Sequence, residues 1–191
     1  ASIVAVDFLE PFLETLTARA DDAGVAERII PCTASMEALD FAAESLDAIW
    51  SEGAIYNIGF ERGVREWHRF LKPGGILAVS ELTWLTERRP AELDAYWREQ
   101  YAEVDTAAAK MALLEHHGYA PLGYFVLPRH CWLEGYYLPL QQRFQTFLSA
   151  HENSAAARTI VQDCRQEIDL YERYSQYFGY GFYIARKSGE G

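Results

Sequence analysis

Residues 3–6, Ile-Val-Ala-Val, form an unbroken apolar run that ends in a carboxylate at Asp7. Such a run is typical of a strand that is buried on both faces of a sheet. The next segment, FLEPFLETLTARADDAG, has apolar residues at helical spacing, with Pro11 near its start and Gly24 as a stop. A buried strand followed at once by a helix needs strand neighbours and cover on both faces. The chain is therefore expected to build a parallel α/β sheet.

The alternation of strand and helix continues to residue 82. The sequence predicts strands at 28–32, 45–53 and 76–82 and a helix at 59–71, with the KPGG segment as a turn before the last of these strands. Alternating elements of this kind predict a Rossmann-like, doubly wound, mostly parallel sheet.

Helices dominate the pattern after Leu82. We expect helices at 90–104, 105–118, 134–150 and 154–178, a strand that starts after Pro121, a closing strand at 179–187 and a tail at 188–191. Asp105 is the expected N-cap of the second of these helices. The segment 84–178 is thus expected to add a helical cap before the last strand. We see no linker or repeat, so residues 1–191 are expected to form a single domain.

The composition of the chain limits the classes of partner that it can bind. Lys and Arg number 17 against 28 Asp and Glu, which gives a formal net charge of −11 and argues against nucleic acid or an anionic membrane surface. Cys32, Cys131 and Cys164 are far apart and lack the spacing of a zinc site, so we expect reduced thiols and no metal. No apolar run approaches the roughly 18 residues of a membrane span. The sequence therefore predicts a soluble, cytoplasmic protein.

Polar side chains gather where the predicted strands end. Five such residues fall at carboxyl ends, where open α/β sheets bind their ligands: Asp7, Ser35, Ser51, Glu52 and Glu81. An acid in the position of Asp7 can accept hydrogen bonds from two ribose hydroxyls. It can equally be a helix N-cap or first-turn acid, and the strand alone leaves both interpretations open.

Four segments in this order resemble the class I S-adenosylmethionine-dependent methyltransferases: VAVDFLEPFLETL, TASMEALDF, SLDAIWSEGAIYNIG and FLKPGGILAVSE. The likeness is close over residues 1–82 and nearest to the small-molecule branch. It implies S-adenosylmethionine as cofactor and a small-molecule methyl acceptor. It also identifies residues 2–7 as the family's second strand, so the chain is expected to be truncated at its N-terminus. The first strand and glycine-rich loop would be missing, which is expected to weaken cofactor binding and favour self-association.

The resemblance also implies roles for individual cofactor-binding residues. Asp7 would hold the ribose diol and Phe8 would flank the adenine. Ser35 stands where many relatives carry an acid that accepts the adenine amino group, and Met36 would supply a backbone N–H and an apolar wall. Ser51, Glu52 and Gly53 would lie beside the methyl sulfonium. Met36 can also be explained as core filling, and Ser51 as a capped strand end.

Methyl transfer needs a general base only if the acceptor must lose a proton. The candidates are Glu52, Glu81, Tyr56 and His130, and each is explained more simply as a surface or structural group. The segment after residue 82 is also rich in aromatic side chains that can form either the core of the cap or a substrate lid: Trp84, Tyr96, Trp97, Tyr101, Trp132, Tyr136 and Tyr137.

Two rival functions follow from the same pattern. A nicotinamide-dependent oxidoreductase shares the ribose-binding acid, although the sequence lacks a Tyr-x-x-x-Lys or comparable constellation for hydride transfer. A degenerate or truncated Rossmann-like domain without catalytic activity is the second rival.

Overall fold

The computed structural model describes residues 1–189, so the last two residues of the expected tail lie outside the described part. The chain divides into two compact units, Ala1–Ala43 and Glu44–Gly191. We refer to them as the N-terminal and the C-terminal unit and describe each by itself. The single domain expected from the sequence stays a prediction.

The N-terminal unit is a βαβ motif. It contains β1 (Ile3–Asp7), α1 (Glu10–Asp22), a 3-10 turn (Ala26–Arg28) and β2 (Ile29–Thr33). The two strands are parallel, with Ile3 opposite Ile29. Helix α1 buries Leu13 and Ala20. The order of elements is as predicted, but burial on both faces of β1 is not found, since Ile3 is 57% exposed. Within residues 1–43, β1 has β2 as its only strand neighbour and α1 as its only long helix.

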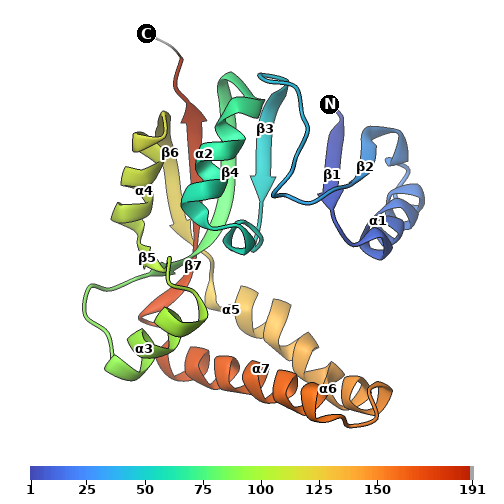
Figure 1. Cartoon of the computed structure of the whole chain (residues 1–191), viewed down its shortest axis with the longest axis vertical. Helices are drawn as coiled ribbons and strands as arrows, with labels where there is room; N and C mark the ends of the chain where they lie inside the picture. Colours follow the sequence, from blue (N-terminus) through green and yellow to red (C-terminus); the bar gives the residue numbers. More distant parts are fainter. Residues whose placement is uncertain (190–191) are drawn as a thin grey trace. The chain divides into compact units, whose positions relative to one another are not determined.

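The C-terminal unit is built on a mixed sheet. Its strand order is β3 (Leu46–Ser51), β4 (Leu71–Trp84), β7 (Phe178–Lys187) and β6 (Tyr119–Val126), and a short β5 (Asp105–Thr106) pairs with the end of β4 (Figure 1). Strand β3 runs parallel to β4, whereas β7 is antiparallel to both β4 and β6. The closing strand therefore lies inside the sheet, and the predicted α/β class is confirmed.

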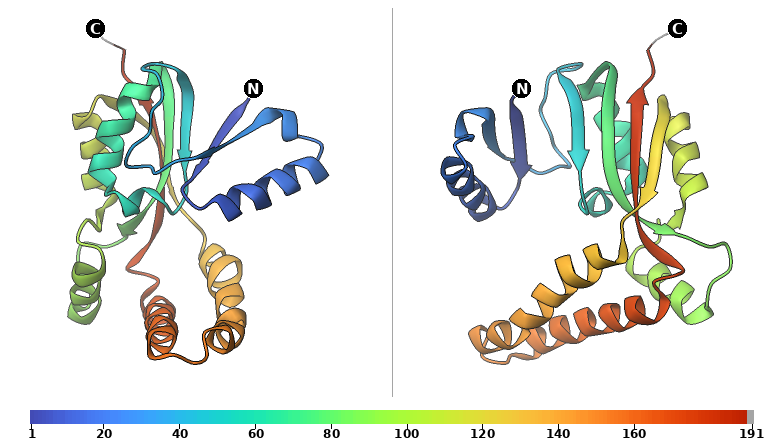
Figure 2. Two further views of the ribbon diagram at one scale, coloured as in Figure 1. Left: turned by 45° about the vertical axis from the view of Figure 1, so that its right-hand side comes forward. Right: turned by 180° about the vertical axis from the view of Figure 1, so that it is seen from behind.

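Two helices cover one face of this sheet. They are α2 (Phe60–Trp67), which continues into a 3-10 turn (His68–Phe70), and α4 (Ala107–His116) (Figure 2). The Phe60 ring lies 5.8 Å from the ring of Tyr183 on β7, which fixes α2 against the strands. A further 3-10 turn (Ile55–Asn57) joins β3 to α2.

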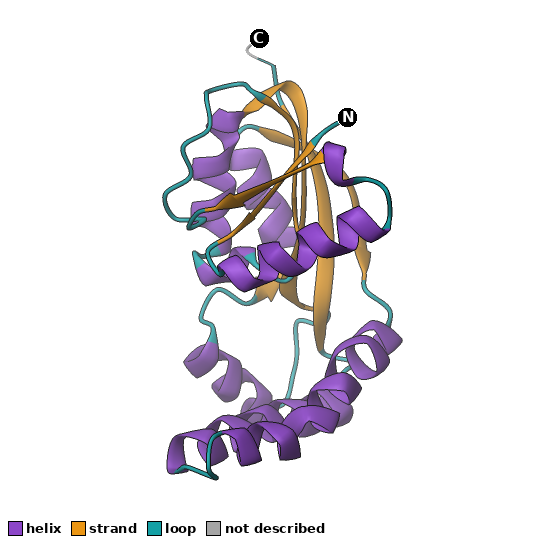
Figure 3. Ribbon diagram, turned by 90° about the vertical axis from the view of Figure 1, so that its right-hand side faces the viewer, coloured by secondary structure: helices purple, strands orange, loops and turns teal. Residues whose placement is uncertain are grey.

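The remaining helices form a layer beyond one end of the sheet (Figure 3). They are α3 (Ala91–Gln100), α5 (Arg129–Trp132), a π-helical turn (Leu133–Tyr137), α6 (Leu138–Ala150) and α7 (Ala155–Tyr174). Their buried aromatic side chains join Leu82, Trp84 and Phe178 of the sheet in one core cluster. This layer is the helical cap that the sequence predicts before the last strand.

Two expected strand boundaries are wrong. The KPGG segment lies inside β4, because Gly74 adopts a φ of +77° and the β3–β4 register shifts between Leu46 and Ala48, so the glycine forms an irregularity in the strand. Strand β6 begins at Tyr119 and includes Pro121. A proline is tolerated there because β6 is an edge strand whose register with β7 shifts between Pro121 and Gly123.

The expected N-cap of α4 is also wrong. Thr106, not Asp105, caps the helix, since its hydroxyl accepts a hydrogen bond from the Ala109 N–H at 3.3 Å. Asp105 pairs with β4 in the short β5, and its carboxylate accepts from the Thr106 N–H. A strand pairing with Thr83 thus holds Asp105 one position before the cap.

Candidate functional site

A pocket of about 590 Å³ lies within the C-terminal unit, where the carboxyl end of β4 meets the helical layer. Six of its lining residues are aromatic, and Lys, Arg and His are absent from the lining. We call it the aromatic pocket; it is lined by Gly53, Tyr56, Leu82, Trp97, Gln100, Tyr101, Trp132, Tyr136, Glu167 and Tyr180.

The ends of two parallel strands form the sheet side of the pocket. Gly53 follows β3 with a φ of +53°, and its N–H donates to the Ser80 hydroxyl of β4 at 2.8 Å. A Cβ at Gly53 would lie 3.8 Å from the Tyr180 hydroxyl. The positive φ and this hydrogen bond hold the loop after β3 beside β4.

Stacked rings form the helical side. Trp132 lies between Tyr171 and Tyr180, with ring centroids 4.7 Å away in both cases. The indole N–H groups of Trp97 and Trp132 are buried and have no hydrogen-bond acceptor within residues 1–189. Trp97 and Trp132 thus belong both to the core and to the pocket wall, whereas Trp84 and Tyr137 are core only. The core alternative therefore holds for these side chains, and the substrate-lid alternative stays a prediction.

Glu81 is a fully buried acid behind this wall. Its carboxylate accepts hydrogen bonds from the Leu82 N–H at 2.7 Å and from the Tyr101 hydroxyl at 3.3 Å. Burial raises the pKa of Glu81 to about 7, although the Lys110 ammonium opposes the shift. Glu81 does not line the pocket and reaches it only through Tyr101.

Lys110 is buried in the same region. Its Nζ donates to the Glu103 carbonyl at 2.7 Å and lies 4.4 Å from the centre of the Phe60 ring. Burial lowers the pKa of Lys110, and Glu81 and Glu103 oppose that shift. A buried cation and a buried acid therefore stabilise each other beside the pocket wall.

Glu167 brings a second carboxylate into the site, and the sequence analysis missed it. It lies on α7 and accepts a hydrogen bond from the Tyr137 hydroxyl at 2.8 Å. Burial raises the pKa of the Glu167 carboxyl, and the bond from Tyr137 opposes the rise. A sequence signal existed, because Glu167 is one helical turn from both Cys164 and Tyr171 on the apolar stripe of α7.

The predicted base candidates are separated in the structure. Tyr56 lines the pocket, and its ring lies 6.1 Å from that of Tyr101, the partner of Glu81. Glu52 is exposed and accepts a hydrogen bond from the Trp50 indole at 2.8 Å. His130 is exposed on α5 and is not a lining residue. Of the four candidates, the structure places Tyr56 on the pocket and Glu81 directly behind it.

The predicted cofactor residues fall in both units. In the N-terminal unit, Asp7 ends β1 and its Oδ1 accepts from the Leu9 N–H at 2.8 Å, so it supports the start of α1. Phe8 is 68% exposed, Ser35 accepts from the Glu37 N–H at 3.2 Å, and Met36 is half-buried. In the C-terminal unit, Ser51 is half-buried at the end of β3, followed by Glu52 and Gly53.

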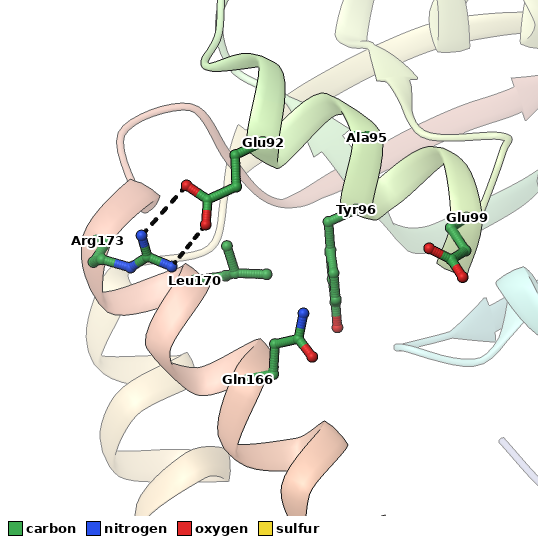
Figure 4. A pocket seen from close by; sticks show the side chains of 7 residues that line it. All are labelled: Glu92, Ala95, Tyr96, Glu99, Gln166, Leu170 and Arg173. Atoms are coloured by element: carbon green, nitrogen blue, oxygen red, sulfur yellow. Dashed lines mark hydrogen bonds and ion pairs between the residues drawn. The ribbon is translucent and has the colours of Figure 1, made fainter.

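A second pocket, of about 240 Å³, lies between α3 and α7 (Figure 4). Its cation, Arg173, is already paired with Glu92 at 3.2 Å and with Asp169 at 2.8 Å. We interpret this pocket as a helix contact closed by ion pairs. Within residues 1–189, no helix has both the length and the apolar character needed for a bilayer crossing, and no cluster of His, Cys, Asp or Glu suited to a metal ion is found.

Comparison with known proteins finds a match to one protein family. Residues 1–79 match the model of the methyltransferase domain family. A methyltransferase from Geobacter sulfurreducens, solved with S-adenosylhomocysteine, superimposes with a TM-score of 0.78 at 18% identity, over 95% of this chain and 74% of that one. A putative sarcosine dimethylglycine methyltransferase from Galdieria sulphuraria superimposes with a TM-score of 0.75 at 17% identity, over 100% of this chain and 70% of that one. The [4+2]-cyclase SpnF superimposes with a TM-score of 0.77 at 19% identity, over 99% of this chain and 67% of that one.

The chain therefore has the class I S-adenosylmethionine-dependent methyltransferase fold, and its residues 1–79 match the methyltransferase domain family. The resemblance seen in the sequence is confirmed. The same comparisons support S-adenosylmethionine as cofactor and methyl transfer as activity, and they favour both over nicotinamide chemistry. Because a cyclase shares the fold, the acceptor has to be argued from the site.

Proposed function

We propose that the protein transfers a methyl group from S-adenosylmethionine to a small molecule bound in the aromatic pocket. The observation that carries the proposal is the position of this pocket at the carboxyl end of β4, bordered by the Gly53 loop, in a chain of methyltransferase fold. Ligands of open α/β sheets bind at this end. One of the similar structures is named for the small acceptors sarcosine and dimethylglycine, which agrees with a small-molecule acceptor.

The cofactor residues of the proposal are those named from the sequence. Asp7 fits a ribose diol, because one carboxylate oxygen supports α1 while the other has no partner within residues 1–189. Phe8, Ser35 and Met36 would surround the adenine, and residues 51–53 would lie near the sulfonium. S-adenosylmethionine supplies an activated methyl group when bound. The aromatic pocket would exclude water and orient the acceptor.

We also propose that the enzyme acts in the cytoplasm on free metabolites. The net charge of −11 opposes binding to nucleic acid and to anionic membranes. The test of the function is calorimetry with S-adenosylmethionine, followed by assay of S-adenosylhomocysteine release with a panel of small acceptors. Absence of cofactor binding would contradict the proposal and favour a domain without catalytic activity.

Asp7→Asn is expected to weaken S-adenosylmethionine binding by about 10- to 150-fold, which corresponds to about 1.5–3 kcal/mol for hydrogen bonds to a charged group. Asparagine keeps an oxygen for the Leu9 N–H, so the thermal midpoint should change little. Asp22→Asn, at the exposed end of α1, is the matched control. An unchanged dissociation constant in calorimetry would show that Asp7 does not bind the cofactor and only supports the turn before α1.

Glu52→Gln and Glu81→Gln are each expected to leave kcat within about tenfold of the wild-type value, because loss of a working general base costs about 10²- to 10⁴-fold. Glu52 is exposed to solvent, and Glu81 is buried behind Tyr101, so neither carboxylate lines the pocket. Steady-state kinetics on folded variants measures the effect. A drop in kcat beyond a hundredfold for either variant would identify that residue as the base.

A further inference from the structure

Glu167 is a half-buried acid without a cation. Its one hydrogen bond in the structure comes from the Tyr137 hydroxyl, and within residues 1–189 it forms no ion pair. Burial and the charge of Glu167 raise the pKa of the neighbouring groups Tyr96, Tyr136, Tyr137, Cys164 and Tyr180. A carboxylate removed from water without a counter-charge is costly, so a cationic partner would relieve that cost.

The protein itself offers no such partner on the pocket wall. Lys, Arg and His are absent from the lining. The buried cation nearest to the wall, Lys110, is committed to the Glu103 carbonyl and to the Phe60 ring. A counter-ion for the ionised form of Glu167 would therefore enter with a ligand.

The rest of the lining is suited to a cation. Six of the lining residues are aromatic, and two of them, Tyr56 and Tyr136, are 42% and 53% exposed, which leaves ring surface for a ligand. The electron-rich faces of Trp and Tyr attract cations, and more strongly where water is excluded. An anionic ligand would meet the Glu167 carboxylate and no positive side chain on the lining.

We propose that the methyl acceptor carries a positively charged nitrogen, which binds between Glu167 and the aromatic rings of the pocket. This inference rests on the proposed function, because it names the class of its acceptor. A neutral acceptor would leave Glu167 without a counter-charge, and a phosphorylated acceptor would lack any cation on the lining to bind it. The substrate class that the lining selects is therefore ammonium and quaternary ammonium compounds that carry a second, nucleophilic atom. A positively charged nitrogen has no lone pair, so that second atom forms the bond to the methyl carbon as S-adenosylhomocysteine leaves.

The test is binding of choline compared with 3,3-dimethylbutan-1-ol, its neutral isostere, in calorimetry at constant ionic strength without S-adenosylmethionine. We expect choline to bind at least about tenfold more tightly, because the two probes differ only in charge. Equal affinities, or no measurable binding of choline, would overturn the inference. Since no methyl group is transferred, this outcome is independent of the proposed activity, which fails separately if no acceptor releases S-adenosylhomocysteine.

A matched pair of variants tests the role of Glu167 itself. Glu167→Gln should lower choline affinity at least about tenfold and leave the affinity of the neutral isostere within about threefold. Glu172→Gln removes the same charge from an exposed position of α7 and should change neither affinity. Tyrosine near-ultraviolet circular dichroism shows that the variants keep the fold. Choline affinity unchanged in Glu167→Gln would overturn the inference.

Discussion

Replacement of Trp132 by alanine is expected to lower the free energy of unfolding of the C-terminal unit by about 3–5 kcal/mol, the usual cost of truncating a buried tryptophan. Trp132 is 5% exposed and stacks on Tyr171 and Tyr180 at the same time. Its loss would open a cavity between α5, α7 and β7. Urea unfolding followed by near-ultraviolet circular dichroism measures the change.

Trp50→Ala is the matched control for Trp132→Ala. Trp50 is 70% exposed at the edge strand β3, with its indole N–H on Glu52. Surface substitutions usually change stability by about 0.5 kcal/mol or less. If both variants lost the same stability, the core would not be centred on the stacked rings of the helical layer.

The stability of the protein is expected to depend on the protonation of Glu81. Burial raises the pKa of Glu81 from 4.5 to about 7, so between these pH values the folded state holds a proton that the unfolded chain releases. The contribution of Glu81 to stability is therefore fully present below pH 4.5 and is lost as the pH rises through about 7. The loss amounts to about 3 kcal/mol, since one pKa unit corresponds to about 1.36 kcal/mol.

Glu81→Gln isolates this effect. The difference in unfolding free energy between the wild-type protein and Glu81→Gln should shift by about 3 kcal/mol in favour of the variant between pH 4.5 and 7.5. Urea titrations at a series of pH values measure it. Glu52→Gln makes the same replacement at an exposed carboxylate and controls for the loss of one charge. A difference that stays constant with pH would show that the pKa of Glu81 is not raised in the folded state.

Local patterns predicted the elements of the fold well. The apolar run at residues 3–6, the helix after Pro11 and the strand from Ile76 are all present. The place of β7 inside the sheet could not be predicted in this way. Strand order depends on pairings such as Ala78 with Ile184, which join distant segments whose apolar patterns carry no information about their partners.

The site was predictable only in part. Residues at strand ends, such as Gly53 and Glu81, follow from the rule that loops at carboxyl ends carry function. Tyr180 and Glu167 enter the pocket from a strand and a helix that are distant from these loops in sequence, and burial in the cap, not any motif, makes Glu167 notable. Before the helix is packed, the sequence indicates only that Glu167 lies one helical turn from Cys164 and Tyr171 on the apolar stripe of α7.

The place of β7 between β4 and β6 has a consequence for how the chain acquires its structure. The hydroxyls of Thr83 and Tyr183, 2.7 Å apart, join residues separated by 100 positions. During synthesis, β4 and β6 emerge long before β7, the strand that separates them. The edges of β4 and β6 that pair with β7, and their apolar faces, therefore stay exposed while α5, α6 and α7 are made. Pairings between such distant segments form slowly and expose aggregation-prone edges in the meantime. Nascent chains of this topology are therefore expected to depend on chaperones until residues 178–187 have left the ribosome.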